Sequence, residues 1–375
     1  MNAPDPTTVV LPPDCRPGDG RFGSGPSKVR PEALARLADT GTTFLGTSHR
    51  RDGVKSVVRR VRTGLADLFA LPDGHEVVLG NGGSTAFWDA LTFGMVEERS
   101  EHVVIGEFSS KFAEVTRAAP FLADPLVVSS PPGTRIDPTP DDSVDLYALV
   151  HNETSTGVMC DVVRPAGAGI VAVDATSGAG ALPVDPAEFD VYYFAPQKAF
   201  GSDGGLWIAL CSPAAIERIE RVGGSGRFVP PSLDLRIALE NSRLDQTYNT
   251  PALATLFLLC DTVEWMNDQG GLAWATGRCD TSAAILYDWA EARDFVTPFV
   301  AEPAARSHAN ATLEFTGVDA TALSAALRAN GIVDVEPYRK IGANQLRIAL
   351  FPAVEPDDVA ALTRALDHLV GVFAG

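Results

Sequence analysis

Apolar residues recur at helix and strand spacing, in alternation, along the first two thirds of the chain. Valines and leucines between Val54 and Leu71 follow the helical period and predict a helix. Two further helices are expected at 84–96, with Ser84 as its cap, and at 110–119. Short apolar runs predict strands at 76–80, 102–106, 125–129, 146–150, 169–174, 190–195 and 206–210. This alternation of short strands and helices indicates a mostly parallel α/β sheet that is covered on both faces.

The pattern changes after Pro251 and predicts a second domain. One or two long helices are expected between Pro251 and Ala292. They precede predicted strands at 311–315 and 345–350 and predicted helices at 320–330 and 356–372. Residues 1–20 are rich in Pro, Asp and Gly, and they predict an arm with little structure of its own. We therefore expect an arm (1–20), a large domain (21–270) and a small α+β domain (271–375).

Composition and charge exclude several classes of binding partner for this protein. The formal net charge of −18 argues against nucleic acid, whose phosphates require a basic surface. The longest apolar stretch, Ala252 to Cys260, is far shorter than the roughly 20 residues of a membrane span. The N-terminus also lacks the basic start and apolar run of a signal peptide. Five cysteines without a C-x-x-C pair predict free thiols in a reducing compartment, hence a cytoplasmic protein, and six scattered histidines predict no metal site.

Three predicted strands end in candidate chemistry, and such sheets bind ligands beyond the carboxyl ends of their strands. Glycines followed by Ser84 and Thr85 open a helix after the first strand, which favours a phosphate-binding turn. Asp174 closes another strand; such an aspartate is more often a cap, but it can also accept from a protonated ring nitrogen. Lys198 follows a third strand, and its apolar flanks argue against a surface lysine.

Together these strand ends supply the contacts that pyridoxal 5′-phosphate (PLP) requires. These contacts are an anion site, an acidic partner for the ring nitrogen and an amine that forms an imine. The acid keeps the ring nitrogen protonated, so that the ring accepts electrons when the substrate Cα loses its proton. The lysine amine is then placed to carry that proton. The sequence therefore predicts a PLP enzyme with Lys198 as its catalytic residue and Schiff-base lysine.

The motifs around these residues resemble those of the fold-type I, class V aminotransferases. The matching segments are Phe22-Gly-Ser-Gly-Pro26, Ser48-His-Arg50, Asn81-Gly-Gly-Ser-Thr85, Gly106-Glu-Phe108, Asn152-Glu-Thr154, Asp174, Gln197-Lys198, Asn249-Thr-Pro251 and Arg347. The resemblance implies a seven-stranded, mostly parallel sheet domain with a small C-terminal domain. It implies cofactor contacts from Gly83, Ser84, Thr85, Phe108, Thr154, Asp174, Gln197, Lys198, Asn249 and Thr250. Of these, Asn249 and Thr250 are expected to reach the neighbouring subunit's cofactor, which implies a homodimer with a shared site.

The resemblance is closest to the branch of the family that handles phosphorylated substrates. Arg347 is expected to hold the substrate α-carboxylate bidentately. His49, Arg50 and Arg339 are the candidate contacts of a second anionic group. The resemblance implies amino transfer between L-glutamate and 3-phosphohydroxypyruvate in two half-reactions, within serine biosynthesis, and it leaves open a second role in pyridoxine biosynthesis. The chain departs from many relatives in having Ser-Thr in the phosphate loop where Gly-Arg is common, and Phe108 where tryptophan is usual.

Several alternatives stay open at this point. A serine– or alanine–glyoxylate aminotransferase would not need a pocket at His49 and Arg50. A cysteine desulfurase would need a cysteine on a mobile loop, whereas Cys260 and Cys279 fall in helical patterns. A non-catalytic protein of the same fold would not need Lys198. A Rossmann dehydrogenase would carry G-x-G-x-x-G after its first strand, and this motif is absent.

Overall fold

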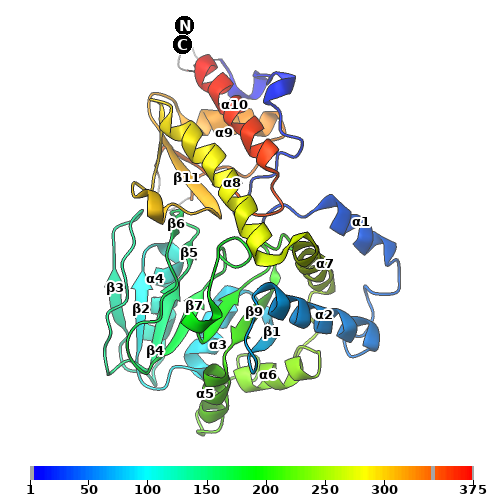
Figure 1. Ribbon diagram of the computed structural model, residues 1–375, viewed down its shortest axis with the longest axis vertical. Coiled ribbons are helices and arrows are strands. Elements are labelled where there is room, and N and C mark those ends of the chain that lie inside the picture. The colour runs from blue at the N-terminus through cyan, green and yellow to red at the C-terminus, as the bar shows by residue number, and fades with distance from the viewer. Residues whose placement is uncertain (1–3, 339–342, 374–375) are drawn as a thin grey trace.

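A seven-stranded sheet forms the centre of the larger part of the protein, in a computed structural model that describes residues 4–338 and 343–373 (Figure 1). Its spatial order is β1 (Glu76–Gly82), β9 (Gly205–Cys211), β8 (Val191–Phe194), β7 (Ile170–Asp174), β4 (Leu146–Val150), β2 (Ser100–Val104) and β3 (Leu126–Ser129). Within this sheet β9 runs antiparallel to both of its neighbours, and the other pairs are parallel. The predicted mostly parallel sheet is therefore confirmed.

Helices cover both faces of this sheet. They are α2 (Asp52–Leu68), α3 (Ser84–Gly94), α4 (Glu107–Ala118), α5 (Pro213–Gly223), α6 (Leu235–Arg243) and α7 (Leu253–Gln269), preceded by α1 (Pro31–Asp39). One apolar cluster packs α2 and α7 against one face, and a second packs α3 to α6 against the other. Strands that are buried on both faces need apolar side chains throughout, which explains their continuous apolar runs.

The C-terminal part is a smaller α+β body at the carboxyl edge of the sheet (Figure 1). It contains α8 (Gly271–Glu291), α9 (Ala320–Ala329) and α10 (Pro356–Phe373), and an antiparallel sheet of β10 (Val296–Pro298), β11 (Asn310–Phe315) and β12 (Gln345–Ala349). These elements share an apolar cluster of their own. We propose the domain boundary at 270/271, because Gly270, at a φ of 127°, separates α7 from α8.

The arm has no long element, yet it is attached to the small domain. Residues 4–20 contain two short 3-10 turns, at Pro6–Thr8 and Pro13–Cys15. Leu11 is buried in the core of the small domain, and its amide donates to the Asn330 side chain over 2.9 Å. These contacts attach the start of the chain to the same body as its end.

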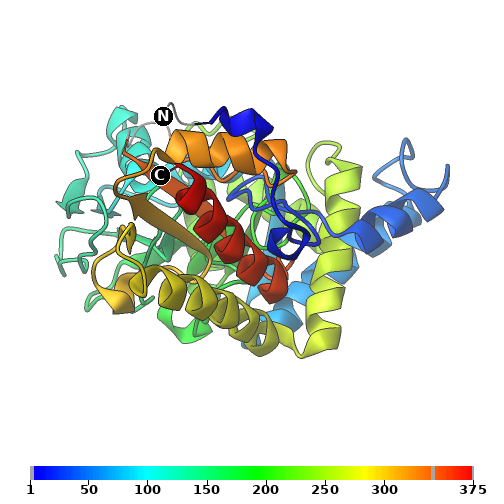
Figure 2. The same cartoon turned by 90° about the horizontal axis from the view of Figure 1, so that it is seen from above.

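The segment that joins α1 to α2 projects from the rest of the molecule, and Figures 1 and 2 agree on this. It contains His49 and Arg50, and Leu45 exposes much of its apolar surface on it, as does Leu34 on the preceding helix α1. A short hairpin of β5 (Asn152–Glu153) and β6 (Val158–Met159) follows β4 and approaches the small domain.

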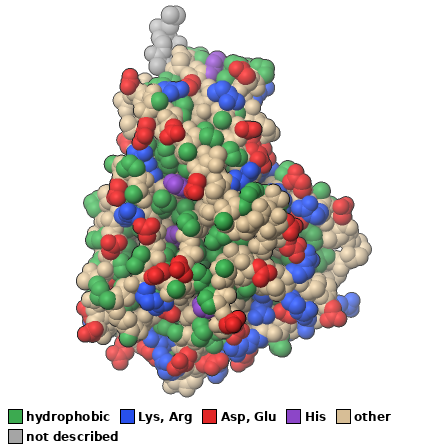
Figure 3. Space-filling model, in the orientation of Figure 1, with side chains coloured by type: hydrophobic (Ala, Val, Ile, Leu, Met, Phe, Trp, Pro, Cys, Tyr) green, Lys and Arg blue, Asp and Glu red, His purple; other side chains and the backbone are tan. Residues whose placement is uncertain are grey.

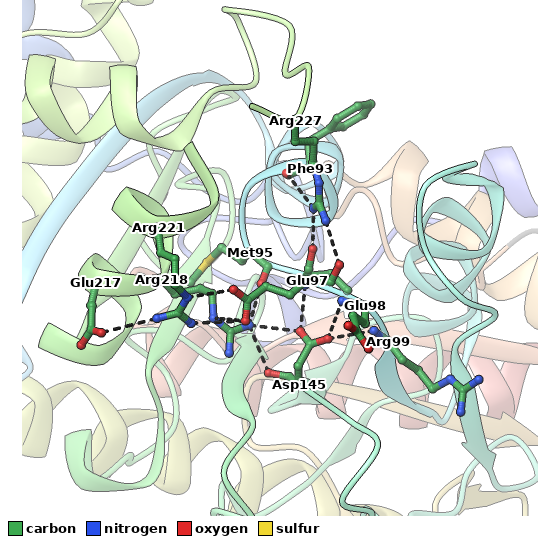
Figure 4. A network of polar contacts seen from close by, with 11 residues as sticks. Phe93, Met95, Glu97, Glu98, Arg99, Asp145, Glu217, Arg218, Arg221 and Arg227 are labelled. Atoms are coloured by element: carbon green, nitrogen blue, oxygen red, sulfur yellow. Dashed lines mark hydrogen bonds and ion pairs between the residues drawn. The ribbon is translucent and has the colours of Figure 1, made fainter. Parts of the chain in front are cut away.

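A polar network stabilises the amino-terminal edge of the sheet (Figure 4). The Asp145 carboxylate, just before β4, accepts from the three amides of residues 97–99 over 2.7–2.9 Å. Arg218 of α5 is buried and donates to the Met95 carbonyl over 2.9 Å and to Asp145 over 3.1 Å. The network thus joins the α3–β2 connection, β4 and α5, on the edge opposite the carboxyl ends of the parallel strands.

The surface is mixed in charge despite the acidic composition. Acidic and basic side chains are interspersed over the face that Figure 3 shows, on both domains. Within the described part of the chain, no helix combines the length and apolar character that a membrane crossing requires.

Candidate active site

A cavity of about 290 Å³ lies at the carboxyl ends of β1, β4, β7 and β8. Its walls come from the connections that follow these strands and from the first turns of α3 and α4. Eight of the predicted cofactor contacts line it, namely Gly83, Ser84, Thr85, Phe108, Thr154, Asp174, Gln197 and Lys198. The four strand ends meet there because parallel strands present their carboxyl ends at one edge of the sheet.

Lys198 is buried at one wall of the cavity. Its Nζ donates to the Ser24 carbonyl over 2.7 Å. Burial, together with the charge of Arg347, lowers the pKa of Lys198 to about 8. Gly25 makes room for this amine: a Cβ there would come within 2.2 Å of Nζ, and its φ of 128° also requires glycine. A lysine with this pKa has a substantial neutral fraction near physiological pH, and the neutral amine is the nucleophile.

Asp174 occupies the floor of the cavity at the end of β7. Its carboxylate accepts from the Thr176 hydroxyl over 2.6 Å and from the Trp88 indole N–H over 3.1 Å. Burial raises the pKa of Asp174. It forms no ion pair with a described residue, and an ionised carboxylate without a cation is costly when buried. A protonated ring nitrogen in the cavity would supply the missing positive charge.

The turn before α3 differs in one detail from the prediction. We expected Ser84 to cap this helix, and this was wrong: Gly83 is the N-cap and Ser84 is the first helical residue. The Ser84 hydroxyl instead bonds the Thr176 hydroxyl over 2.6 Å. The turn still presents a helix N-terminus to the cavity, which suits a phosphate. Nearby, the buried Oε1 of Gln197 has no hydrogen-bond partner among the described residues, as expected where a ligand is to be bound.

Phe108 and Arg347 approach the cavity from different domains. Phe108 is the second residue of α4, and its ring centre lies 6.0 Å from Lys198 Nζ. Arg347 extends from β12 and donates to the Thr154 carbonyl over 3.1 Å. Its guanidinium lies over the ring of Tyr338 at 5.5 Å, and its buried Nε has no partner among the described residues. Burial lowers the pKa of Arg347, and an anionic ligand would compensate this cost.

Four other predicted site residues form a separate cluster in this chain. None of His49, Arg50, Asn249 and Thr250 lines the cavity. His49 Nδ1 lies 3.1 Å from the Thr250 hydroxyl, and Arg50 donates to Gln246 over 2.9 Å. Burial, followed by the charge of Arg50, lowers the pKa of His49. Arg339, the remaining candidate, lies outside the described residues.

Reasoning from the sequence missed several residues that line the cavity, among them Trp88 and Glu153. Trp88 donates to Asp174, and its position four residues after Ser84 places both on one face of α3, which was a usable signal. Glu153 is fully buried beside Phe108 and Ser109. Its position within the Asn152-Glu-Thr154 motif did not reveal these contacts.

Comparisons with known proteins agree with this geometry. The family model for aminotransferase class-V matches residues 22–335. The phosphoserine aminotransferase of Rhodococcus jostii is 57% identical over 367 residues, which cover 97% of this chain and 98% of the relative. That of a Nocardioides species is 58% identical, with 96% and 98% covered.

Solved structures show the same fold. The phosphoserine aminotransferase of Cytophaga hutchinsonii matches with a TM-score of 0.88 at 23% identity, covering 94% of this chain and 100% of that chain. The protein of that name from Bacillus circulans subsp. alkalophilus matches with a TM-score of 0.82 at 21% identity, covering 93% and 98%. These likenesses confirm the expected fold type I.

The residues present suit the cofactor of this family. Lys198 offers a buried amine, Asp174 a buried carboxylate with no ion-pair partner among the described residues, and the start of α3 a helix N-terminus that suits an anion. The comparisons and the cavity agree on a PLP-dependent aminotransferase. The chain therefore belongs to the class V aminotransferases and, within them, to the phosphoserine aminotransferase family.

Proposed function

We propose that this enzyme transfers the amino group of L-glutamate to 3-phosphohydroxypyruvate, reversibly, and so forms 2-oxoglutarate and O-phospho-L-serine for serine biosynthesis. The observation that carries the proposal is that Lys198 and Asp174 line one buried cavity, while Arg347 bonds the carbonyl of Thr154 in its wall and lowers the pKa of Lys198. The full-length similarity to relatives that are named for this activity supports the choice of substrates.

Each residue of the cavity has a proposed task. When bound, PLP supplies an electron sink for the carbanion that forms at the substrate Cα. Lys198 would hold the cofactor at rest, and its amine would carry the proton of the substrate Cα. Asp174 keeps the ring nitrogen protonated, and Phe108 contacts the ring face. The amides and hydroxyls of residues 83–85, together with Gln197, would hold the phosphate, and Thr154, which also lines the cavity, would contact the cofactor.

Arg347 is the proposed contact of the α-carboxylate. Both amino acids and both oxo acids carry this group, so one guanidinium serves both half-reactions. Its planar fork binds a carboxylate bidentately, which a lysine cannot do. Its position beside Lys198 brings the substrate Cα next to the amine that must move the proton.

We also propose a homodimer in which each subunit completes its partner's site. The cluster of His49, Arg50, Asn249 and Thr250 is separate from the cavity of its own chain, and two of its members lie on the projecting segment before α2. In a two-fold dimer such a segment can reach the partner's cavity. His49 and Arg50 would then contact the substrate phosphate, and Asn249 and Thr250 the cofactor phosphate. Arg339 stays a candidate on the sequence alone.

A cytoplasmic location remains part of the proposal. Five free cysteines support it, four of them buried, since an oxidising compartment favours disulfides.

Steady-state kinetics with a phosphorylated and an unphosphorylated oxo acid test the substrate assignment. We expect kcat/KM for 3-phosphohydroxypyruvate to exceed that for hydroxypyruvate by roughly a hundredfold or more, because the phosphate forms charge-assisted hydrogen bonds. Arg50→Ala should remove most of this preference and leave the hydroxypyruvate rate unchanged. Arg51→Ala, at the exposed neighbouring arginine, is the matched control. Equal rates with both oxo acids would instead favour a glyoxylate-type aminotransferase.

A further inference from the structure

Helix α4, which carries Phe108 at its second position, starts without a capping side chain of its own. Its N-cap is Gly106, and glycine has no side chain with which to accept from the first amides of the helix. The Ser109 hydroxyl accepts from the Gly106 amide over 3.1 Å. The amides of Phe108 and Ser109 therefore require an acceptor from elsewhere in the fold.

Glu153 supplies this acceptor from the hairpin after β4, more than forty residues along the chain. Its Oε2 accepts from the amide and the hydroxyl of Ser109 over 3.1 and 3.0 Å. Its Oε1 accepts from the Phe108 amide over 3.4 Å and from the Ser155 hydroxyl over 2.7 Å. A buried carboxylate at a helix N-terminus also interacts favourably with the helix dipole.

The close approach of Glu153 to α4 depends on Gly106. A Cβ at Gly106 would lie 2.4 Å from Glu153 Cγ, so a side chain there would displace the carboxylate. The glycine that leaves the helix uncapped is thus also the residue that admits Glu153. The next residue, Thr154, accepts from Arg347 through its carbonyl. Glu153 therefore sits at the point where the start of α4 meets the small-domain arginine.

We propose that Glu153 is a positioning residue, which holds the ring of Phe108 at the cofactor cavity by capping helix α4 through both carboxylate oxygens. This inference rests on the stacking role proposed for Phe108. Glutamine is the informative substitution, because its amide nitrogen would face backbone N–H groups that need an acceptor. The size of the side chain is preserved, and only the charge and one of the two acceptor oxygens are lost.

A double-mutant cycle on the dissociation constant of PLP tests the proposal without any measurement of turnover. We expect Glu153→Gln to weaken PLP binding about tenfold, and Phe108→Ala to weaken it by a similar factor. If Glu153 acts through Phe108, the double variant should bind PLP within about threefold of Phe108→Ala alone. Losses that multiply to about a hundredfold would overturn the proposal, as would unchanged binding by Glu153→Gln.

Two further variants serve as a control and as a substitute in case Glu153→Gln does not fold. Glu114→Gln changes an exposed carboxylate on the same helix and should leave the dissociation constant unchanged. Should Glu153→Gln fail to fold, Ser109→Ala removes one donor to the same carboxylate and should weaken PLP binding about threefold; an unchanged value would overturn the proposal. If Phe108→Ala alone binds PLP normally, the stacking role in the proposed function fails instead.

Discussion

At the residue scale, the site depends on ionisable groups that are buried before any ligand binds. Lys198 and Arg347 lose hydration together, and burial lowers the pKa of both, whereas burial raises the pKa of Asp174. Burying each of these charged groups therefore costs free energy, which a bound PLP or substrate carboxylate can offset. The cavity gains its affinity for charged ligands at the expense of the stability of the ligand-free fold.

The cost at Lys198 predicts a pH-dependent stability of the cofactor-free protein. The folded-state pKa of about 8 lies below the 10.5 of an unburied lysine, so the unfolded chain binds more protons between these values. Stability should therefore rise with pH across this window, by about 3 kcal/mol, relative to Lys198→Met. Below pH 8 the difference between the two proteins should be constant. Urea unfolding of both proteins at several pH values measures this, and parallel curves from pH 8 to 10.5 would contradict the burial of a titrating amine.

Trp88 offers a second test at this scale. Trp88→Phe removes the indole donor to Asp174 and should raise the pKa of that carboxyl further, because its ionised form loses a hydrogen bond. PLP affinity should fall about tenfold, and its loss on acidification should begin at a higher pH. Fluorescence titration at several pH values measures both effects. Trp274→Phe, on α8, is the control, and equal affinities in all three proteins would exclude the role.

From the sequence, the site residues at strand ends could be predicted, whereas the side-chain contacts made within the site could not. Asp174 and Lys198 were predictable because each directly follows or closes an apolar strand, and parallel topology brings such ends together. The contact of Glu153 with Ser109 spans 44 residues. No periodicity encodes such a pairing, since it depends on how the β5–β6 hairpin packs on α4.

At the element scale, the seven strands of the large sheet were predicted to within about two residues, because burial on both faces makes them continuous apolar runs, whereas the short strands β5, β6 and β10 were not predicted. Their direction was not predictable, and β9 runs antiparallel within a sheet that is otherwise parallel. Helices α1, α5 and α6 were not predicted, although each carried a signal: Pro31 starts α1, and Ser212 and Asp234 cap α5 and α6.

The polar network at the amino-terminal edge should affect stability without affecting catalysis. Arg218→Met leaves the Met95 carbonyl and Asp145 without their buried partner and should cost about 3 kcal/mol of unfolding free energy. Arg221→Met, at a half-exposed arginine of the same helix, should cost under about 1 kcal/mol. Denaturant unfolding gives both values. A loss of kcat in the folded Arg218→Met enzyme would show that this edge is coupled to the active site.

At the scale of the whole molecule, we expect each active site to be built by both domains of one chain and by a segment of a second subunit. Arg347 comes from the small domain, whereas all the residues that line the cavity come from the large one, so the proposed substrate site requires both. The proposed dimer adds the projecting segment of a second chain. Sequence motifs indicated that these residues belong to one site, but a single chain does not bring His49 or Arg50 to Lys198.

Hybrid dimers test the shared site. Lys198→Ala is expected to be inactive, and Arg50→Ala to keep only a small fraction of the wild-type activity towards the phosphorylated substrate. After subunit exchange in an equal mixture, half of the dimers are hybrids, and each hybrid has one complete site. About a quarter of the wild-type activity should then return. A mixture that exchanges subunits but stays inactive would place both residues in the site of one chain.

The most direct test of the central claim is the visible absorbance of the PLP-loaded enzyme, followed in a stopped-flow instrument. The enzyme is mixed with O-phospho-L-serine in one experiment and with L-serine in the other. The account predicts a visible band that Lys198→Ala lacks, and its rapid loss with phosphoserine but not with serine. Equal responses to both amino acids would contradict the phosphate specificity, and an unaltered band in Lys198→Ala would contradict the site itself.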